Sequence, residues 1–237
     1  MKTSVVRSVL FMLASWSTLP AAELTVNWLD QKAPAVRAGV SFGVPFKKGV
    51  WQRADTLAVK GAAGAAVPAQ TWPLAVWPDG SVKWLGVAVS GGPDLAGPLH
   101  LDKGGAVLPV TPLKATQDAG GVSIDTGVLQ CRVAASGDRF IESMTIAGRL
   151  VARDGQLVAM TEDRTNEGAT GVMREARYVS EISRVTLEQA GSVRAVVKIE
   201  GMHRAVGGGR DWLPFTVRLY RSEERRVGKE CLRLCRS

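Results

Sequence analysis

Apolar residues alternate with small or polar residues along most of this 237-residue chain. Between Val36 and Val44 the apolar side chains occupy every second position, so an extended strand would direct all of them to one face. No sustained 3.6-residue apolar stripe occurs, and the best helix candidate, Thr165–Arg177, is interrupted by Gly168 and Gly171. Many short alternating runs separated by turn residues are typical of β-barrels and β-sandwiches, so the predicted fold class is all-β.

The clearest hairpin joins two alternating runs, Trp72–Trp77 and Val82–Val89, through the turn Pro78–Ser81. Proline presets φ, aspartate can bond the backbone two residues on, and glycine supplies a positive φ, so this Pro-Asp-Gly-Ser run is a strong turn signal. Pro73 has no N–H to donate, which predicts that the first run lies at the edge of a sheet or that its strand begins late.

A second series of strands follows a stretch rich in Gly, Pro and Asp over residues 90–121. A domain boundary is therefore expected near Ala115–Gly121. The turn Ala190–Ser192 is predicted to join two of the later strands. The strands predicted beyond the boundary are Val122–Val133, Arg139–Ile146, Leu150–Met160, Val179–Gln189, Val193–Glu200 and Leu213–Tyr220.

Residues 1–22 have the composition of a secretory signal peptide. Lys2 and Arg7 supply the positive start, Val9–Ala14 begins an apolar stretch, and Leu19–Ala22 provides small residues for cleavage. The apolar stretch is shorter than the roughly 20 residues that span a bilayer, so a membrane span is not expected. The predicted localisation is secreted or periplasmic, with membrane anchoring as the alternative.

Residues 221–237 differ from the rest of the chain, with dense charge and two of the three cysteines. The run RSEERRVGKEC, from Arg221 to Cys231, resembles a translated sequencing adapter. We therefore expect 221–237 to be a non-native tail, with the natural chain continuing from Tyr220 into further sequence. A solvated basic tail is the alternative.

The two ends of the chain also carry much of its formal net charge of +8. The remaining Lys and Arg residues are spread along the sequence, whereas nucleic-acid binding needs them clustered, so no nucleic-acid partner is expected. Cys131 is the only cysteine before the tail, which excludes an internal disulfide. We expect Cys131 to be a small buried residue on a strand.

Three segments together resemble one family: GVSFGVPFKKGVW (39–51), QTWPLAVWPDGSVKWLGVAV (70–89) and DWLPFTVRLY (211–220). They are similar to the exo-rhamnogalacturonan lyase and YetA-like family of secreted proteins. The resemblance implies an N-terminal RIFT-type β-barrel over residues 23–115 and the first part of a central β-sandwich over 116–220. It also implies a C-terminal α/α-toroid that holds most of the catalytic apparatus and lies beyond this chain.

Lyase chemistry on a uronic acid needs a base for the proton alpha to the carboxylate and a cation for the enolate-like charge. His203, Arg204 and Arg210 combine a titrating group with cations near the flexible loop Gly207–Gly209, so they are the predicted substrate-binding residues. A solvated loop without a binding role is the alternative. His100 is interpreted as a strand or loop residue, and the sequence assigns no catalytic residue.

Other chemically active residues have structural explanations. Asp79 suits the predicted turn, and Lys83 alternates with its apolar neighbours on a strand. No cofactor is expected, although Asp154, Glu162 and Asp163 offer carboxylates that suit calcium in the full-length protein. Core packing is expected to account for most tryptophans, with one a candidate for lining a sugar groove. These tryptophans are Trp28, Trp51, Trp72, Trp77, Trp84 and Trp212.

Together these features favour the N-terminal, non-catalytic part of a secreted carbohydrate-active enzyme that acts on a pectin-type polysaccharide. The resemblance makes the parent a rhamnogalacturonan lyase-like protein, a carbon–oxygen lyase, and implies that this part alone is inactive. The alternatives are a non-catalytic carbohydrate-binding module and an envelope scaffold built from β domains.

Overall fold

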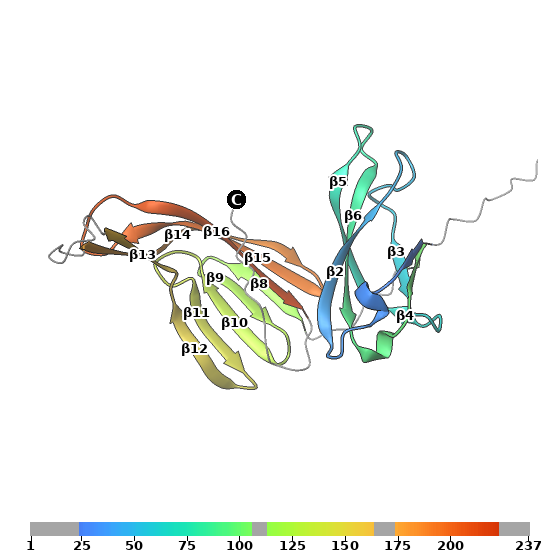
Figure 1. Ribbon diagram of the computed structural model, residues 1–237, viewed down its shortest axis with the longest axis horizontal. Helices are drawn as coiled ribbons and strands as arrows, with labels where there is room; N and C mark the ends of the chain where they lie inside the picture. The colour runs from blue at the N-terminus through green and yellow to red at the C-terminus, as the bar shows by residue number, and fades with distance from the viewer. Residues whose placement is uncertain (1–23, 106–112, 164–173, 223–237) are drawn as a thin grey trace, which may run out of the picture.

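The structure, a computed structural model, describes residues 24–105, 113–163 and 174–222. These residues form β-strands and two short 3-10 turns, η1 (Leu29–Gln31) and η2 (Pro93–Leu95). Figure 1 shows the strands gathered into two lobes that follow one another along the chain. The predicted all-β fold class is confirmed.

The N-terminal lobe consists of two antiparallel sheets, with strand orders β1-β7-β3-β4 and β2-β6-β5. Its strands are β1 (Leu24–Val26), β2 (Ala38–Pro45), β3 (Leu57–Lys60), β4 (Ala66–Val67), β5 (Ala69–Val76), β6 (Val82–Gly91) and β7 (Leu99–Lys103). The alternating apolar residues of both sheets face each other and form one core, which includes Val44, Val87 and Leu101. Trp51 closes this core, stacked on Phe46 at a centroid distance of 4.6 Å.

The β5–β6 hairpin forms as the sequence predicts. Its turn is closed by a hydrogen bond of 2.8 Å from the Trp77 N–H to the Ser81 carbonyl, and Gly80 adopts φ +83°. The Asp79 carboxylate accepts hydrogen bonds from the backbone N–H and the hydroxyl of Ser81. β5 lies at the edge of its sheet, so the edge position predicted from Pro73 is confirmed.

The C-terminal lobe is a sandwich of two antiparallel sheets, with strand orders β12-β11-β10-β9-β8 and β13-β14-β15-β16. In the first sheet the strands are β8 (Lys114–Asp118), β9 (Gly121–Asp125), β10 (Leu129–Ala134), β11 (Ile141–Ile146) and β12 (Arg149–Gly155). In the second they are β13 (Val158–Asp163), β14 (Arg174–Ala190), β15 (Arg194–Ala205) and β16 (Trp212–Ser222). The predicted turn Ala190–Ser192 does connect β14 to β15.

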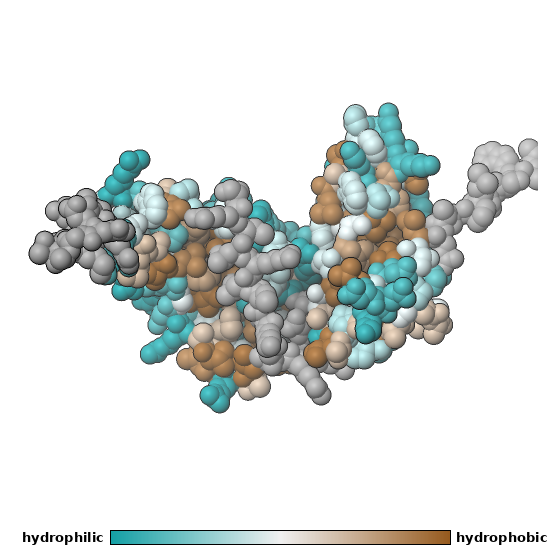
Figure 2. Space-filling view, in the orientation of Figure 1, coloured by the Kyte–Doolittle hydropathy of each residue, from teal (hydrophilic) through white to brown (hydrophobic). Residues whose placement is uncertain are grey.

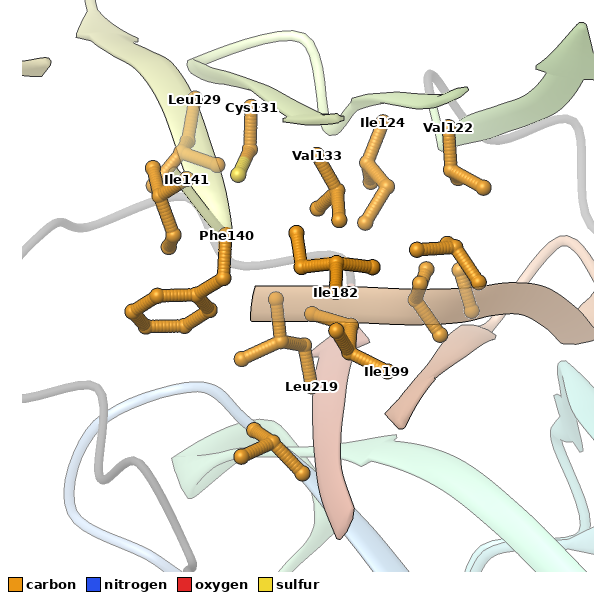
Figure 3. Close-up of a cluster of buried hydrophobic side chains, with 14 of the residues drawn as sticks. Val122, Ile124, Leu129, Cys131, Val133, Phe140, Ile141, Ile182, Ile199 and Leu219 are labelled. Atoms are coloured by element: carbon orange, nitrogen blue, oxygen red, sulfur yellow. The ribbon is translucent and has the colours of Figure 1, made fainter. Parts of the chain in front are cut away.

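The sandwich core lies between these two sheets. Alternate residues of β9 and β10 meet alternate residues of β14, β15 and β16, as Figure 3 shows for Ile124, Val133, Ile182 and Leu219. Cys131 lies in the same apolar layer and is 3% exposed, which confirms its predicted role as a buried strand residue.

Two predicted strands are wrong, because each spans two strands of the structure. The run Val122–Val133 is two strands, β9 and β10, because Thr126 and Gly127 form a tight turn in which Gly127 has φ +84°. The run Leu150–Met160 likewise divides into β12 and β13, which belong to different sheets. Arg174–Arg177, the end of the helix candidate, belongs to strand β14, and its remainder lies outside the described residues.

Two boundaries differ from the predicted ones in detail. β8 begins at Lys114 and already pairs with β9, so the sandwich includes residues before Thr116. β16 continues past Tyr220 to Ser222, and Arg221 is buried opposite Ala195. The rest of the adapter-like tail and the predicted signal peptide lie outside the described residues.

Candidate functional site

The predicted substrate-binding residues do not converge. His203 is buried on the core side of β15, where its ring contacts Phe215 edge-on and its Nδ1 lies 2.8 Å from the Leu213 carbonyl oxygen. Arg204 is the next residue along the strand and therefore points to the opposite face, where it pairs with Glu181 at 3.3 Å. Arg210 is exposed in the loop between β15 and β16. Their joint role in substrate binding stays a prediction, and the structure gives His203 a packing role.

The other candidate residues lie in structural positions. Asp79 belongs to the β5–β6 turn, and its hydrogen bonds to Ser81 lower the pKa of its carboxyl. Lys83 lies over the ring of Trp77 at 4.6 Å. His100 belongs to strand β7, opposite Thr25. Asp154 pairs with Arg139 at 2.9 Å.

A different set of residues meets where the two lobes touch. The guanidinium of Arg194, at the start of β15, lies 4.5 Å from the ring centre of Trp72 on β5 and 4.7 Å from that of Tyr220 on β16. Its Nη1 donates a hydrogen bond of 2.9 Å to the Ser41 hydroxyl on β2. One side chain of the sandwich is therefore held by two strands of the barrel.

Burial changes the electrostatics of this arginine. Desolvation lowers the pKa of the Arg194 guanidinium from its usual range, although an arginine stays protonated at neutral pH. Its Nε is buried and has no hydrogen-bond partner among the residues that the structure describes. The π faces of Trp72 and Tyr220 partly compensate for the lost water, because a desolvated cation over an aromatic ring gains up to about 2 kcal/mol.

Gln70 makes the second connection between the lobes. Its side-chain oxygen accepts hydrogen bonds from the backbone N–H groups of Val193 (3.2 Å) and Arg194 (2.9 Å). The amide occupies the space beside Gly191, where an added Cβ would lie 2.0 Å from the Gln70 oxygen. A glycine in the β14–β15 turn is therefore required for close approach, and the barrel inserts a side chain into the space it leaves.

The barrel wall at this junction is the outer face of the sheet β2-β6-β5. Trp72 lies against Gly86, where a Cβ would meet its indole at 2.3 Å. One pleat further along β6 lies Trp84, whose ring packs over Gly43 beside Leu74. Trp84 is 41% exposed and Leu74 is 55% exposed, so this end of the wall is apolar and open.

The adjoining sandwich wall is the outer face of β14, β15 and β16, and it is basic. Alternation along these strands places the cations Arg184, Arg194, Lys198 and Arg218 on this face, against the carboxylates Glu188 and Glu200. The hydrogen bond from Lys198, with the nearby charges of Arg184 and Arg218, lowers the pKa of Glu200. Figure 2 shows the surface hollowed between the two lobes, on the side to which the β5–β6 hairpin projects.

Sequence reasoning missed the junction, although part of its signal was visible. Gln70 and Trp72 lie at the start of one of the three segments that carry the family resemblance, and Gly191 was predicted as a turn residue. Arg194 carried no local signal, because an arginine at a strand start resembles any solvated cation. Within the described ranges, no three His, Cys, Asp or Glu side chains are grouped to hold a metal ion, and no helix could cross a bilayer.

Fold and junction together define a class: an all-β architecture in which a small barrel is clamped to a β-sandwich. Residues 22–104 match the family model described as the PcRGLX-like N-terminal RIFT barrel domain. Residues 113–231 match the PcRGLX-like protein central beta sandwich domain. The chain therefore belongs to the PcRGLX-like family, and the predicted resemblance and the barrel-then-sandwich order are confirmed.

A curated relative supports this assignment. The chain is 38% identical over 195 residues to a protein of Bacillus subtilis (strain 168) described as uncharacterized protein YetA. The alignment covers 82% of this chain and 22% of the relative, so the chain spans about a fifth of the length of that protein.

Proposed function

We propose that this chain is the N-terminal, non-catalytic part of a secreted polysaccharide lyase-like protein that acts on rhamnogalacturonan. Its barrel and sandwich would hold a catalytic domain and form one side of the substrate path. Residues 1–22 would direct export to the periplasm or the medium.

The Arg194 junction is the observation that carries this proposal. Contacts from Ser41, Gln70 and Trp72 fix the angle between the two lobes, as a positioning scaffold requires. Two of the candidate titrating residues serve structural purposes, since His203 bonds a carbonyl and Asp79 closes a turn. The family models name the same two domains as N-terminal and central, which supports a further part that supplies the chemistry.

The test is a comparison of the full-length natural protein with residues 23–222 on rhamnogalacturonan I. We expect the full-length protein to release oligosaccharides with a new ultraviolet-absorbing double bond at the non-reducing end, because β-elimination leaves an unsaturated uronate. Residues 23–222 should release none. Release of saturated sugars alone, or of no product at all, would contradict the lyase assignment, and activity of residues 23–222 would contradict the non-catalytic role.

Export has its own test. The protein should be recovered from the medium or periplasm of the producing cells, with an N-terminus close to Ala22 or Glu23. Recovery from the cytoplasm with Met1 retained would contradict a secreted protein.

A further inference from the structure

We propose that Trp84 is a sugar-stacking platform and that an acidic polysaccharide chain lies in the hollow between the two lobes. The inference rests on the proposed function, because it places a pectin-type chain on a particular surface of the barrel. The chemical class of the ligand is a pyranose polymer that carries uronate carboxylates.

Trp84 differs from Trp28, Trp51, Trp72 and Trp77 in its surroundings. Trp51 is buried in the barrel core, and Trp72 lies between Gly86 and the Arg194 guanidinium. Trp28 and Trp77 each donate an indole hydrogen bond to a backbone carbonyl. Trp84 instead packs on the sheet over Gly43 and remains 41% exposed.

The neighbours of Trp84 make a shallow apolar wall. Pro45 is opposite Trp84 on β2 and is exposed, and Leu74 reaches the same position above Gly43 from β5. Figure 2 shows hydrophobic atoms on the part of the barrel lobe that carries β5 and β6. An exposed apolar aromatic face suits the C–H-rich face of a sugar ring, while the sugar hydroxyls remain in water.

Charge complementarity selects an acidic polymer over a neutral one. Trp84 and Gly86 are two residues apart on β6, or about 7 Å. The indole of Trp72 packs against Gly86, and the Arg194 guanidinium lies over that indole, so Arg194 is close to the proposed platform. From Arg194 the basic face continues along β15 to Lys198, so an oligosaccharide that stacks on Trp84 would extend toward these cations. Lys198 pairs with Glu200 at 2.6 Å and Arg218 with Glu188 at 2.8 Å, so Arg184 and Arg194 supply the excess positive charge that a uronate would meet.

Trp212 provides a matched control. It is 46% exposed, close to the exposure of Trp84, but it lies on β16 away from the junction. Its ring centre lies 5.5 Å from that of Tyr178. Trp84→Ala and Trp212→Ala therefore remove similar exposed aromatic area from different surfaces. Trp84→Phe keeps a smaller stacking face at the proposed site.

The experiment measures calorimetric affinity of the full-length natural protein for rhamnogalacturonan I oligosaccharides, polygalacturonate fragments and neutral galactan. Trp84→Ala is expected to weaken binding of the uronate-containing ligands about tenfold, as expected when an aromatic anchor is truncated. Trp84→Phe should weaken it less, and Trp212→Ala should leave it unchanged. Binding should also weaken as salt is raised, because part of it is electrostatic.

The experiment distinguishes failure of the platform from failure of the proposed function. If the wild-type protein binds or cleaves rhamnogalacturonan and Trp84→Ala has the same affinity, the platform is refuted and the proposed function stands. If the wild-type protein binds none of the three saccharides, both are refuted. If Trp84→Ala lowers the melting temperature of the full-length protein without changing sugar affinity, the surface is covered by another part of the protein and the platform is refuted.

Discussion

The interlock between Gln70 and Gly191 gives the sharpest test of how the two lobes are joined. In the structure the Gln70 amide fills the space that a side chain at position 191 would need, with its oxygen 2.0 Å and its Cδ 2.1 Å from an ideal Cβ. Distances below 3.0 Å do not occur for real Cβ atoms, so Gly191→Ala must expel the amide. Gly191 has no left-handed φ, so alanine is compatible with the backbone itself.

The expected magnitudes follow from the hydrogen bonds. Gln70→Ala leaves the N–H groups of Val193 and Arg194 without their acceptor, and an unpaired buried donor costs about 1–3 kcal/mol. Both donors share one oxygen at a partly buried site, so we expect a loss of about 2 kcal/mol in total. Gly191→Ala should cost about the same, because it displaces the same amide.

The double variant separates the interlock from two unrelated effects. With Gln70 shortened to alanine, the new methyl at position 191 has space, and its own cost should fall within about 0.5 kcal/mol of zero. The loss of stability in the double variant should therefore be about 2 kcal/mol smaller than the sum of the losses in the two single variants. Urea unfolding of the mature protein, followed by circular dichroism at the transition that includes the sandwich, measures all four free energies of unfolding.

Gly61→Ala is the control for adding a methyl group to a glycine. Its Cβ would make ordinary contacts at 3.7 Å or more, so the free energy of unfolding should change by less than about 1 kcal/mol. Equal costs of Gly191→Ala with and without the Gln70 side chain would refute the interlock, because additivity means that the two residues do not share space.

Three further predictions follow from other contacts. Arg194→Lys keeps the charge but loses the planar stacking on Trp72 and Tyr220, so the two lobes should separate more often. The radius of gyration measured by X-ray scattering should increase, and the free energy of unfolding should fall by about 1–2 kcal/mol. An unchanged scattering curve would contradict the clamp. Ser81→Ala removes the acceptor of the Gly49 N–H, at 3.0 Å, and should cost about 1–3 kcal/mol in thermal unfolding, whereas a neutral result would show that water replaces the hydroxyl. The pKa of Glu200 is lowered from 4.5 by its hydrogen bond from Lys198, so the stability that this pair contributes is complete above pH 4.5 and is lost as the pH falls through the lower folded value. The difference in free energy of unfolding between wild type and Lys198→Gln should therefore shrink below about pH 4.5. A difference that grows below that pH would contradict this sign.

The strand positions could be predicted wherever a few neighbouring residues decide the conformation. The β5–β6 turn at Asp79 and the edge position of Pro73 were both predicted, since each depends on local backbone chemistry. The turn at Gly127 was missed, although the buried apolar residues change from even positions, Val122 and Ile124, to odd positions from Leu129 onward. Local pattern therefore identifies strands better than it divides them.

The residues of the candidate site could not be predicted from the sequence, for a different reason. His203 and Arg204 are adjacent in sequence, yet a strand directs them to opposite faces, one to the core and one to solvent. Gln70 and Val193 are 123 positions apart, yet they share a hydrogen bond. For His203 and Arg204, closeness in sequence was misleading about closeness in space. For Gln70 and Val193, separation in sequence gave no signal that the two residues meet.

By itself, the sequence determined the fold class, the barrel-then-sandwich order and the family, because alternation, turn residues and motifs are written in short stretches of chain. Only the tertiary structure decided which face of each strand meets the other lobe, that Arg194 lies in the junction, and that Trp84 remains open. These properties depend on the path of the whole chain, since a period of two defines two faces without saying what each face will meet.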